Sequence, residues 1–527
     1  GQHNILHIED LEISMRDGIV LLADRYIPKG IKNPPLLLCR SCYGRKGIFG
    51  LMFGRFFAER GYQVLVQSCR GTSGSGDILN PNIQEHADGL DTIEWMKKQN
   101  WYPSRFGTIG GSYLGYTQWA LADRAGTDLV SITPHYTTSI FSDHWYMGNS
   151  FSLEGHLLWC NMMKNAEKGL SMFGRTSKSK LKRILNSLPL IDFDVKLVGK
   201  ELKAWRNIVL NSEPPYAYWD STDRRDKVSN VKAKVNFLTG WWDIFLPWNL
   251  EDYLIFKKNG HTPYLTIGPW PHGNLALLAE GVKESIAWHD AFLRNKDTGL
   301  RKNPVRLFIM GSNVWKEYSE WPPQKSVPQH WFIQPGGILS KNNPIKSDPD
   351  TYVYDPENPT PKIEGGFGMM GIPWGQTDVR KIEKRKDVLV YTSKPIKKDL
   401  EIIGPVTAEL YVKSSLNNTD FLVRVCDVFP NGKTLNICEG LQRLRPNDIS
   451  FGEDATIKVK IELWPTAYSF KKGHRIRLHV ASGSHPRWVL NTGSGEPIAT
   501  ATKFVTSHQE IYHDPEHLSV IILPVMH

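Results

Sequence analysis

The stretch 106–115 contains the residue with the clearest chemical potential, Ser112. A short apolar run ends in Gly110 and Gly111, Ser112 follows, and a helix-permissive segment begins at once. This pattern predicts a strand, a sharp turn and a helix, with the serine hydroxyl held at the turn. Free backbone N–H groups at the start of such a helix can stabilise an oxyanion, which suits a serine nucleophile. The match to G-x-S-x-G is imperfect because the second glycine is replaced by Leu114, and a Gly-Gly-Ser turn is also ordinary loop chemistry.

A serine hydroxyl is a poor nucleophile until a histidine takes its proton, and the histidine needs a carboxylate to orient it. Downstream of Ser112, Asp243 and then His272 each follow an apolar run that reads as a strand. The order Ser, Asp, His is that of α/β-hydrolases, and carboxyl ends of parallel strands are where such a site assembles. For Asp243 the alternative is a helix N-cap. The competing residues are His135, His144, His156, His289, Asp220 and Asp290.

The elements that must position these residues alternate between strands and helices. Apolar runs at 36–39, 62–66 and 106–111 are separated by predicted helices at 49–60 and 85–99, which indicates a parallel sheet. The alternation stops near 139. The sequence from there on has a mostly helical pattern, and the alternation resumes at 235. We therefore predict an α/β-hydrolase domain over 1–139 and 235–325, interrupted by a helical cap insertion over 140–234.

After residue 325 the helical periodicity disappears and short β segments recur. They lie at 388–391, 406–412, 421–428, 457–463, 475–481 and 517–524, separated by turns. This pattern predicts a C-terminal all-β domain over 326–527, of the jelly-roll type. The predicted fold class is thus α/β with a second, all-β domain.

Composition excludes several classes of function. The net charge of +10 is spread along the chain, with no focused basic face, so we expect no nucleic-acid partner. No run of 18 apolar residues exists, so we expect no membrane span. The start of the chain, 1–4, is not a signal peptide, and we expect a cytoplasmic protein unless a leader was removed before Gly1. Cys39 and Cys42 form a C-x-x-C without a second ligand pair at zinc spacing, so free thiols are expected rather than a metal site.

Three separated motifs resemble one known family. They are Gly110-Gly111-Ser112-Tyr113-Leu114-Gly115, Gly240-Trp241-Trp242-Asp243 and Gly268-Pro269-Trp270-Pro271-His272. They look like the triad motifs of the cocaine esterase-like (CocE/NonD) serine hydrolases, relatives of the X-Pro dipeptidyl-peptidases and α-amino acid ester hydrolases. Further matches are Arg70-Gly71, the spacing Glu85…Asp88…Asp91, and the distal motifs 473–478, 484–487 and 491–493. The resemblance covers nearly the whole chain in the same order.

The resemblance implies roles for further residues. It implies an oxyanion hole made by the backbone N–H of Tyr113 and the hydroxyl of Tyr43, although Tyr43 could also be a core or rim aromatic. It implies no metal and no organic cofactor. Members of the family that bind an α-amino group place a glutamate after the Ser-Tyr pair, where this chain has Leu114. A cationic amine would need a carboxylate partner, so an α-amino ester or X-Pro peptide substrate is disfavoured.

The sequence therefore predicts a serine hydrolase that cleaves an ester, or less readily an amide, of a small apolar acyl substrate through an acyl-enzyme. Trp145, Trp242 and Trp270 are candidates for substrate contact, or simply core residues. The alternatives are an acyltransferase or cyclase using the same triad, an X-Pro dipeptidyl-peptidase-like activity, and a non-catalytic ligand-binding protein. The expected partner is a small-molecule ester, and surfaces of the cap and the β domain could serve a homodimer.

Overall fold

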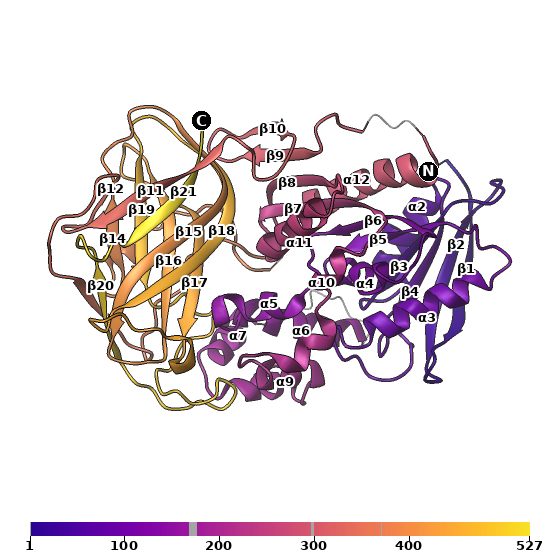
Figure 1. Ribbon diagram of the computed structural model, residues 1–527. Helices are drawn as coiled ribbons and strands as arrows, with labels where there is room; N and C mark the ends of the chain where they lie inside the picture. Colours follow the sequence, from indigo (N-terminus) through magenta and orange to yellow (C-terminus); the bar gives the residue numbers. More distant parts are fainter. Residues whose placement is uncertain (1, 168–176, 297–299, 370) are drawn as a thin grey trace.

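A ten-stranded sheet carries the predicted nucleophile at the centre of the N-terminal half (Figure 1). The computed structural model describes residues 2–167, 177–296, 300–369 and 371–527. The strands from β4 to β9 pair in parallel, while the strands at the two ends, β1, β2 and β10, pair antiparallel. In spatial order the strands are β1 (Ile5–Ser14), β2 (Val20–Pro28), β4 (Gln63–Ser68), β3 (Leu36–Ser41), β5 (Phe106–Gly111), β6 (Leu129–His135), β7 (Lys234–Trp242), β8 (Tyr264–Pro271), β9 (Val305–Ile309) and β10 (Val314–Tyr318).

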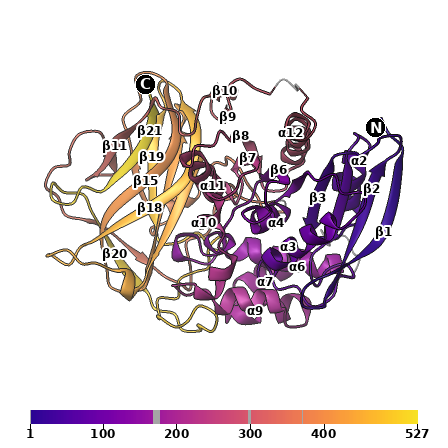
Figure 2. The same cartoon turned by 45° about the vertical axis from the view of Figure 1, so that its right-hand side comes forward.

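Helices cover both faces of this sheet, which is why its central strands read as continuous apolar runs. In β5, Gly107 faces His289 of helix α12 (Leu275–Leu293), while the next residue, Thr108, donates a hydrogen bond to Gln118 of helix α4 (Tyr113–Ala122). Successive side chains on a strand point to opposite faces, so α12 and α4 lie on opposite sides. Helices α3 (Glu85–Lys97) and α11 (Leu246–Lys258) lie on the same side as α4 (Figures 1 and 2), since α3 contacts α4, and Trp119 of α4 and Tyr253 of α11 both pack against Phe237 of β7.

The helix predicted over 49–60 is irregular. It consists of α1 (Gly47–Phe49), a π-helical segment η1 (Gly50–Arg55) and α2 (Phe56–Ala58). Two of its glycines lie directly on Tyr26 of β2: a Cβ on Gly50 would be 2.5 Å from the tyrosine hydroxyl, and one on Gly54 would be 2.3 Å from the ring. The glycines are therefore required by close packing against the sheet edge.

The described parts of the segment between β6 and β7 are mostly helical, as predicted, and lie against both halves of the molecule (Figures 1 and 2). Its backbone also pairs with the C-terminal domain, because the N–H groups of Leu153 and Glu154 donate to the carbonyls of Arg487 and Pro486. Its elements are α5 (Phe141–Trp145), η2 (Met147–Asn149), α6 (Leu153–Glu167), α7 (Lys178–Leu185), η3 (Leu190–Asp192), α8 (Phe193–Val198), α9 (Lys203–Leu210), η4 (Ala217–Thr222) and α10 (Arg225–Val228).

The C-terminal half is a mostly antiparallel β domain, so the predicted fold class is confirmed. All six predicted β segments overlap strands, although the last begins three residues before β21. Two short 3₁₀ helices lie in its connections, η5 (Ile382–Lys384) and η6 (Pro446–Asp448). Its strands are β11 (Ser326–Gln334), β12 (Ile338–Ser340), β13 (Asp350–Tyr354), β14 (Leu389–Thr392), β15 (Leu400–Ser414), β16 (Thr419–Val428), β17 (Thr434–Leu444), β18 (Ile457–Phe470), β19 (Arg475–Ala481), β20 (Ser507–Tyr512) and β21 (Val520–Met526). The domain boundaries at 139/140, 234/235 and 325/326 stay predictions.

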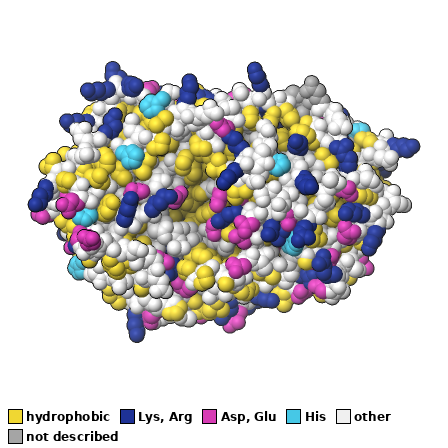
Figure 3. All heavy atoms as spheres, in the orientation of Figure 1, with side chains coloured by type: hydrophobic (Ala, Val, Ile, Leu, Met, Phe, Trp, Pro, Cys, Tyr) yellow, Lys and Arg dark blue, Asp and Glu magenta, His cyan; other side chains and the backbone are white. Residues whose placement is uncertain are grey.

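The surface charge is mixed, and the two cysteines of the C-x-x-C motif are buried. Basic and acidic side chains are interspersed over the face drawn in Figure 3. Among the described residues, no helix has the length and apolar character that crossing a membrane requires. Cys39 and Cys42 are buried free thiols, and burial raises the pKa of both.

Candidate active site

The turn between β5 and α4 holds Ser112 in a backbone conformation that few residues adopt. Its φ of 58° and ψ of −130° lie outside the helical and extended regions. Two neighbouring glycines are fixed by contacts: a Cβ on Gly111 would be 1.9 Å from the Tyr136 ring, and one on Gly115 would be 2.5 Å from Thr137. The second glycine stands at 115 because this is where helix α4 meets Thr137. The glycine at 115 therefore has a packing cause.

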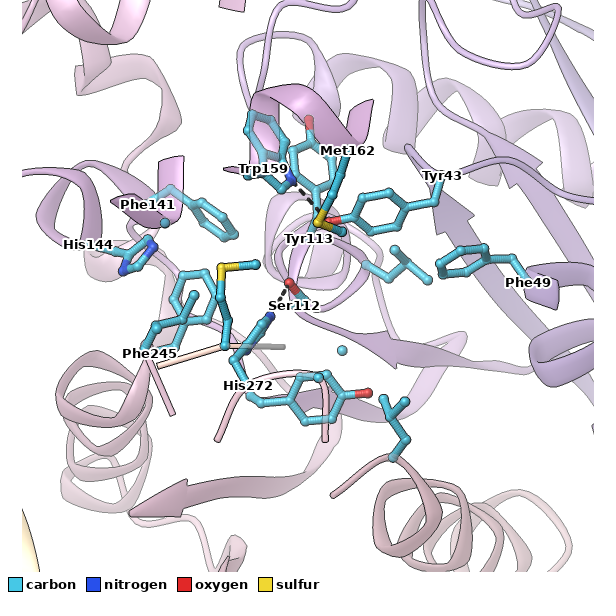
Figure 4. Close-up of a pocket in the computed structure, with 18 of the residues that line it drawn as sticks. Tyr43, Phe49, Ser112, Tyr113, Phe141, His144, Trp159, Met162, Phe245 and His272 are labelled. Atoms are coloured by element: carbon cyan, nitrogen blue, oxygen red, sulfur yellow. Dashed lines mark hydrogen bonds between the residues drawn. The ribbon is translucent and has the colours of Figure 1, made fainter. Parts of the chain in front are cut away.

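Ser112, His272 and Asp243 form one hydrogen-bonded chain (Figure 4 shows the first two). The Nε2 of His272 lies 2.8 Å from Ser112 Oγ, and its Nδ1 lies 2.9 Å from Asp243 Oδ2. Asp243 is fully buried, and its other oxygen, Oδ1, accepts the backbone N–H of Phe245 at 2.7 Å. The aspartate thus both closes the turn before helix α11 and contacts the histidine. Because Asp243 faces Nδ1, the arrangement favours a proton on Nδ1 and leaves Nε2 free to accept one from the serine.

The β domain holds the two loops that carry Asp243 and His272. The N–H of His272 donates to the carbonyl of Gly368 at 3.0 Å, and the N–H of Gly368 donates to the carbonyl of Trp242 at 2.8 Å. The indole N–H of Trp464, on β18, donates to the carbonyl of Asp243 at 3.2 Å. This support could not be predicted from the sequence, although the closely spaced glycines at 365, 366 and 368 mark the segment involved.

None of the four competing histidines contacts Ser112 or Asp243 in the described hydrogen bonds. His135, packed against helix α12, contacts Asn236 at 3.0 Å, and His289, on α12 itself, contacts Ser131 at 2.8 Å. Burial lowers the pKa of His135 to about 4 and that of His289 to about 3. His144 and His156 line the cavity described below, and burial lowers the pKa of both, that of His156 to about 4.

The two competing carboxylates, Asp290 and Asp220, lie away from His272. Asp290 accepts hydrogen bonds from Tyr62 at 2.5 Å and Arg294 at 2.8 Å, on the far end of helix α12. Asp220 is exposed on η4 of the cap. Neither is a partner of His272 in the described hydrogen bonds.

Tyr43 and Tyr113 lie on the side of Ser112 opposite Phe245 (Figure 4). The Tyr43 hydroxyl interacts with Ser112 and accepts the indole N–H of Trp159 at 3.1 Å. Burial raises the pKa of Tyr43 well above its usual value, so the hydroxyl stays protonated and remains a donor. Tyr113 is the first residue of α4, where a backbone N–H has no acceptor within its own helix. The two groups that the family resemblance implies for an oxyanion hole thus flank the serine.

A cavity of about 620 Å³ opens over Ser112. Aromatic and aliphatic side chains from the α/β domain, the cap and the β domain line it, among them Phe49, Phe141, Trp145, Trp159, Met162, Phe245 and Met369 (Figure 4). None of its described lining residues is Asp or Glu. The one lysine, Lys46, lies at the edge with its Nζ 2.6 Å from Glu9 Oε2 and 3.0 Å from Asp10 Oδ2. Among the described residues no cluster of His, Cys, Asp and Glu could hold a metal ion.

Of the three tryptophans predicted to contact substrate, Trp145 lines this cavity and the other two do not. Trp242 lies in the main hydrophobic core, and Trp270 packs against Trp315 with ring centres 5.8 Å apart. The motif glycines make room for Trp270, because a Cβ on Gly240 would be 2.1 Å from its carbonyl oxygen. The aromatic character of these motifs therefore serves strand packing. Phe49 and Phe245 also line the cavity, and nothing in their local sequence predicts this.

Comparisons with known proteins agree with this geometry. Residues 17–274 match the X-Pro dipeptidyl-peptidase (S15 family) model, and residues 299–522 match the X-Pro dipeptidyl-peptidase C-terminal non-catalytic domain. The cocaine esterase of Rhodococcus sp. (strain MB1 Bresler) is 29% identical, and the alignment covers 98% of this chain and 97% of the relative.

Solved structures share the whole fold. An α-amino acid ester hydrolase matches with a TM-score of 0.84 at 22% identity, over 100% of this chain and 97% of the other. An aminopeptidase from a marine sediment Thaumarchaeota archaeon matches with a TM-score of 0.83 at 20% identity, with the same coverage. At this level of identity the two structures show the fold alone. Taken together, the two adjoining family models and the esterase relative place this chain in the CocE/NonD group of the X-Pro dipeptidyl-peptidase (S15) family, and it is a serine hydrolase of the esterase type.

Proposed function

We propose that Ser112, His272 and Asp243 are the catalytic triad of an esterase that works through an acyl-enzyme. The observation that carries the proposal is the 2.8 Å contact between Ser112 Oγ and His272 Nε2 on a strained turn, with Asp243 on the far nitrogen. Ser112 Oγ attacks the ester carbonyl carbon while His272 Nε2 takes the hydroxyl proton. The alkoxide then leaves with that proton, and a water molecule activated by the same histidine hydrolyses the acyl-serine.

In this proposal the negative oxygen of the tetrahedral intermediate is stabilised by Tyr43 and the Tyr113 N–H. Both donors are in place before the reaction begins, since Tyr43 is held by Trp159 and Tyr113 is fixed in helix α4. Such preorganised donors stabilise charge as it develops without reorganising during the step.

The same site favours an uncharged ester with apolar groups on either side of the scissile bond. An ammonium group in the cavity would lose its hydration without gaining a carboxylate, because Leu114 and its neighbours supply none. This argues against α-amino esters and X-Pro peptides as substrates, although the family is named for the latter. A carboxylate would find only Lys46, which Glu9 and Asp10 already neutralise.

Labelling with a fluorophosphonate tests the proposal. We expect one adduct per chain, mapped to Ser112, and none in Ser112→Ala protein that has the wild-type circular dichroism spectrum. The p-nitrophenyl butyrate ester should be hydrolysed with a higher kcat/KM than p-nitrophenyl esters of α-amino acids. Folded wild-type protein that takes no label from either a bulky or a small fluorophosphonate would refute the triad and favour a ligand-binding protein.

A further inference from the structure

Asn82 is a polar side chain with no protein partner inside an otherwise apolar cavity. Its side chain is 1% exposed, it belongs to the cavity lining, and neither Oδ1 nor Nδ2 has a hydrogen-bond partner among the described atoms. Buried amides are nearly always paired, so an orphaned amide at a ligand cavity points to a group supplied by the ligand.

The backbone of Asn82 is held next to the nucleophile. Its N–H donates to the Tyr113 hydroxyl at 2.9 Å, and that hydroxyl donates in turn to Glu85 Oε1 at 2.9 Å. The backbone that carries the Asn82 amide is therefore fixed by a hydrogen bond to the side chain of the residue that follows Ser112.

The chemistry of the cavity narrows what Asn82 can bind. A cationic group would lack a carboxylate, and an anionic group would find Lys46 already paired. A purely apolar group would leave both amide atoms of Asn82 unpaired. What remains is a neutral group that donates and accepts hydrogen bonds side by side, and a carboxamide has this pattern.

We propose that Asn82 is a specificity-determining residue that binds a carboxamide-like group of the ester substrate. The inference deepens the proposed function and rests on it. The substrate class it names is an uncharged ester with one neutral amide among otherwise apolar groups. A site built to hydrogen-bond such a group discriminates against the analogue that lacks it, by about 10- to 100-fold for one buried pair.

A backbone explanation for the asparagine competes with this one. The φ of Asn82 is +68°, in the left-handed region that asparagine tolerates better than most residues. Asn82→Gly separates the two explanations, because glycine keeps this conformation at no steric cost but removes the amide. Asn82→Asp is the second variant, since the side chain keeps its shape while the NH₂ donor is replaced by a negatively charged oxygen. Asn80→Ala is the matched control, because Asn80 is not part of the cavity lining and its Oδ1 accepts a hydrogen bond from Asn207 of cap helix α9 at 2.9 Å.

The experiment compares pairs of p-nitrophenyl esters. In each pair the acyl chain ends either in a carboxamide or in an isopropenyl group of the same shape, and the chain length increases across the series. A second series carries the same two groups on the phenol. We measure the ratio of kcat/KM, amide over hydrocarbon, with enzyme concentrations fixed by fluorophosphonate titration.

For at least one pair we expect this ratio to fall about 10- to 100-fold in Asn82→Gly, mainly through KM, and to stay at the wild-type value in Asn80→Ala. Asn82→Asp should gain hydrolysis of the matching ester that ends in an ammonium group. A ratio unchanged in Asn82→Gly for every pair, or lowered equally by Asn80→Ala, would overturn the role of Asn82. If wild-type protein hydrolyses no ester and takes no label, the proposed function fails and this inference fails with it.

Discussion

Replacing Tyr43 with phenylalanine removes one hydroxyl and leaves the aromatic packing in place. The ring of Tyr43 stacks on Phe49 with centres 5.2 Å apart, and phenylalanine can make the same contact. What is lost is the donor beside Ser112 and the acceptor for the indole N–H of Trp159. The variant therefore tests the proposed oxyanion role with little change of shape.

The expected loss of activity follows from the count of donors. Two groups, the Tyr43 hydroxyl and the Tyr113 N–H, would share the oxyanion, and removing one donor typically costs about 10²- to 10³-fold in kcat, or about 2.7 to 4 kcal/mol. The oxyanion exists only after attack, so KM should stay within about threefold. The unpaired indole N–H of Trp159 should lower the free energy of unfolding by about 1 kcal/mol.

The assay is steady-state and single-turnover hydrolysis of a p-nitrophenyl ester. Acylation should slow by the same factor as kcat if acylation limits turnover. Tyr116→Phe is the control, because it also removes a buried tyrosine hydroxyl. That hydroxyl, on helix α4, donates to the Thr222 carbonyl at 2.7 Å, away from Ser112. The Tyr116→Phe protein should have a lower free energy of unfolding than wild type but the wild-type kcat. A Tyr43→Phe enzyme with kcat within about fivefold of wild type would refute the oxyanion role, given the magnitude expected for such a donor.

The remaining predictions concern buried groups outside the triad. Burial raises the pKa of Asp252 from 3.8 to about 8, although Ser139 donates two hydrogen bonds to it. The folded state thus binds a proton that the unfolded state releases, and the free energy of unfolding should fall as pH rises from about 4 to 8. Asp252→Asn should flatten this dependence on pH, and at pH 9 its free energy of unfolding in urea titrations should exceed that of wild type by at least about 1 kcal/mol. Equal slopes in both proteins would contradict the raised pKa of Asp252. Cys39 and Cys42 should not react with iodoacetamide in the native protein, and their rapid alkylation with loss of activity would show that they are accessible.

The residues of the proposed triad could be predicted from the sequence because each of them follows a clear strand pattern. Ser112, Asp243 and His272 sit directly after apolar runs, and parallel strands bring their carboxyl ends to one edge. Helical and β periodicity likewise predicted the α/β domain, the inserted helices and the β domain, since those patterns are local properties of the chain.

What the sequence did not reveal depends on contacts between distant segments. Trp242 precedes Asp243 but points into the core, because neighbouring side chains at a strand end lie on opposite sides. Met369 reaches the cavity from the β domain, and no periodicity indicates that. Asn82 is an ordinary polar residue in a connection until its burial and its missing partners are known.

The hydrogen bonds at Gly368 change how the two halves of this chain can be separated. One glycine backbone joins the loop before Asp243 to the loop that carries His272, so both loops depend on a segment from the half whose family model is named non-catalytic. An N-terminal fragment would keep the turn that carries Ser112. It would lose the Gly368 hydrogen bonds that set the spacing between His272 and Asp243. Substitutions in the β domain that never touch the cavity can therefore change turnover, because they can move the two loops that Gly368 joins.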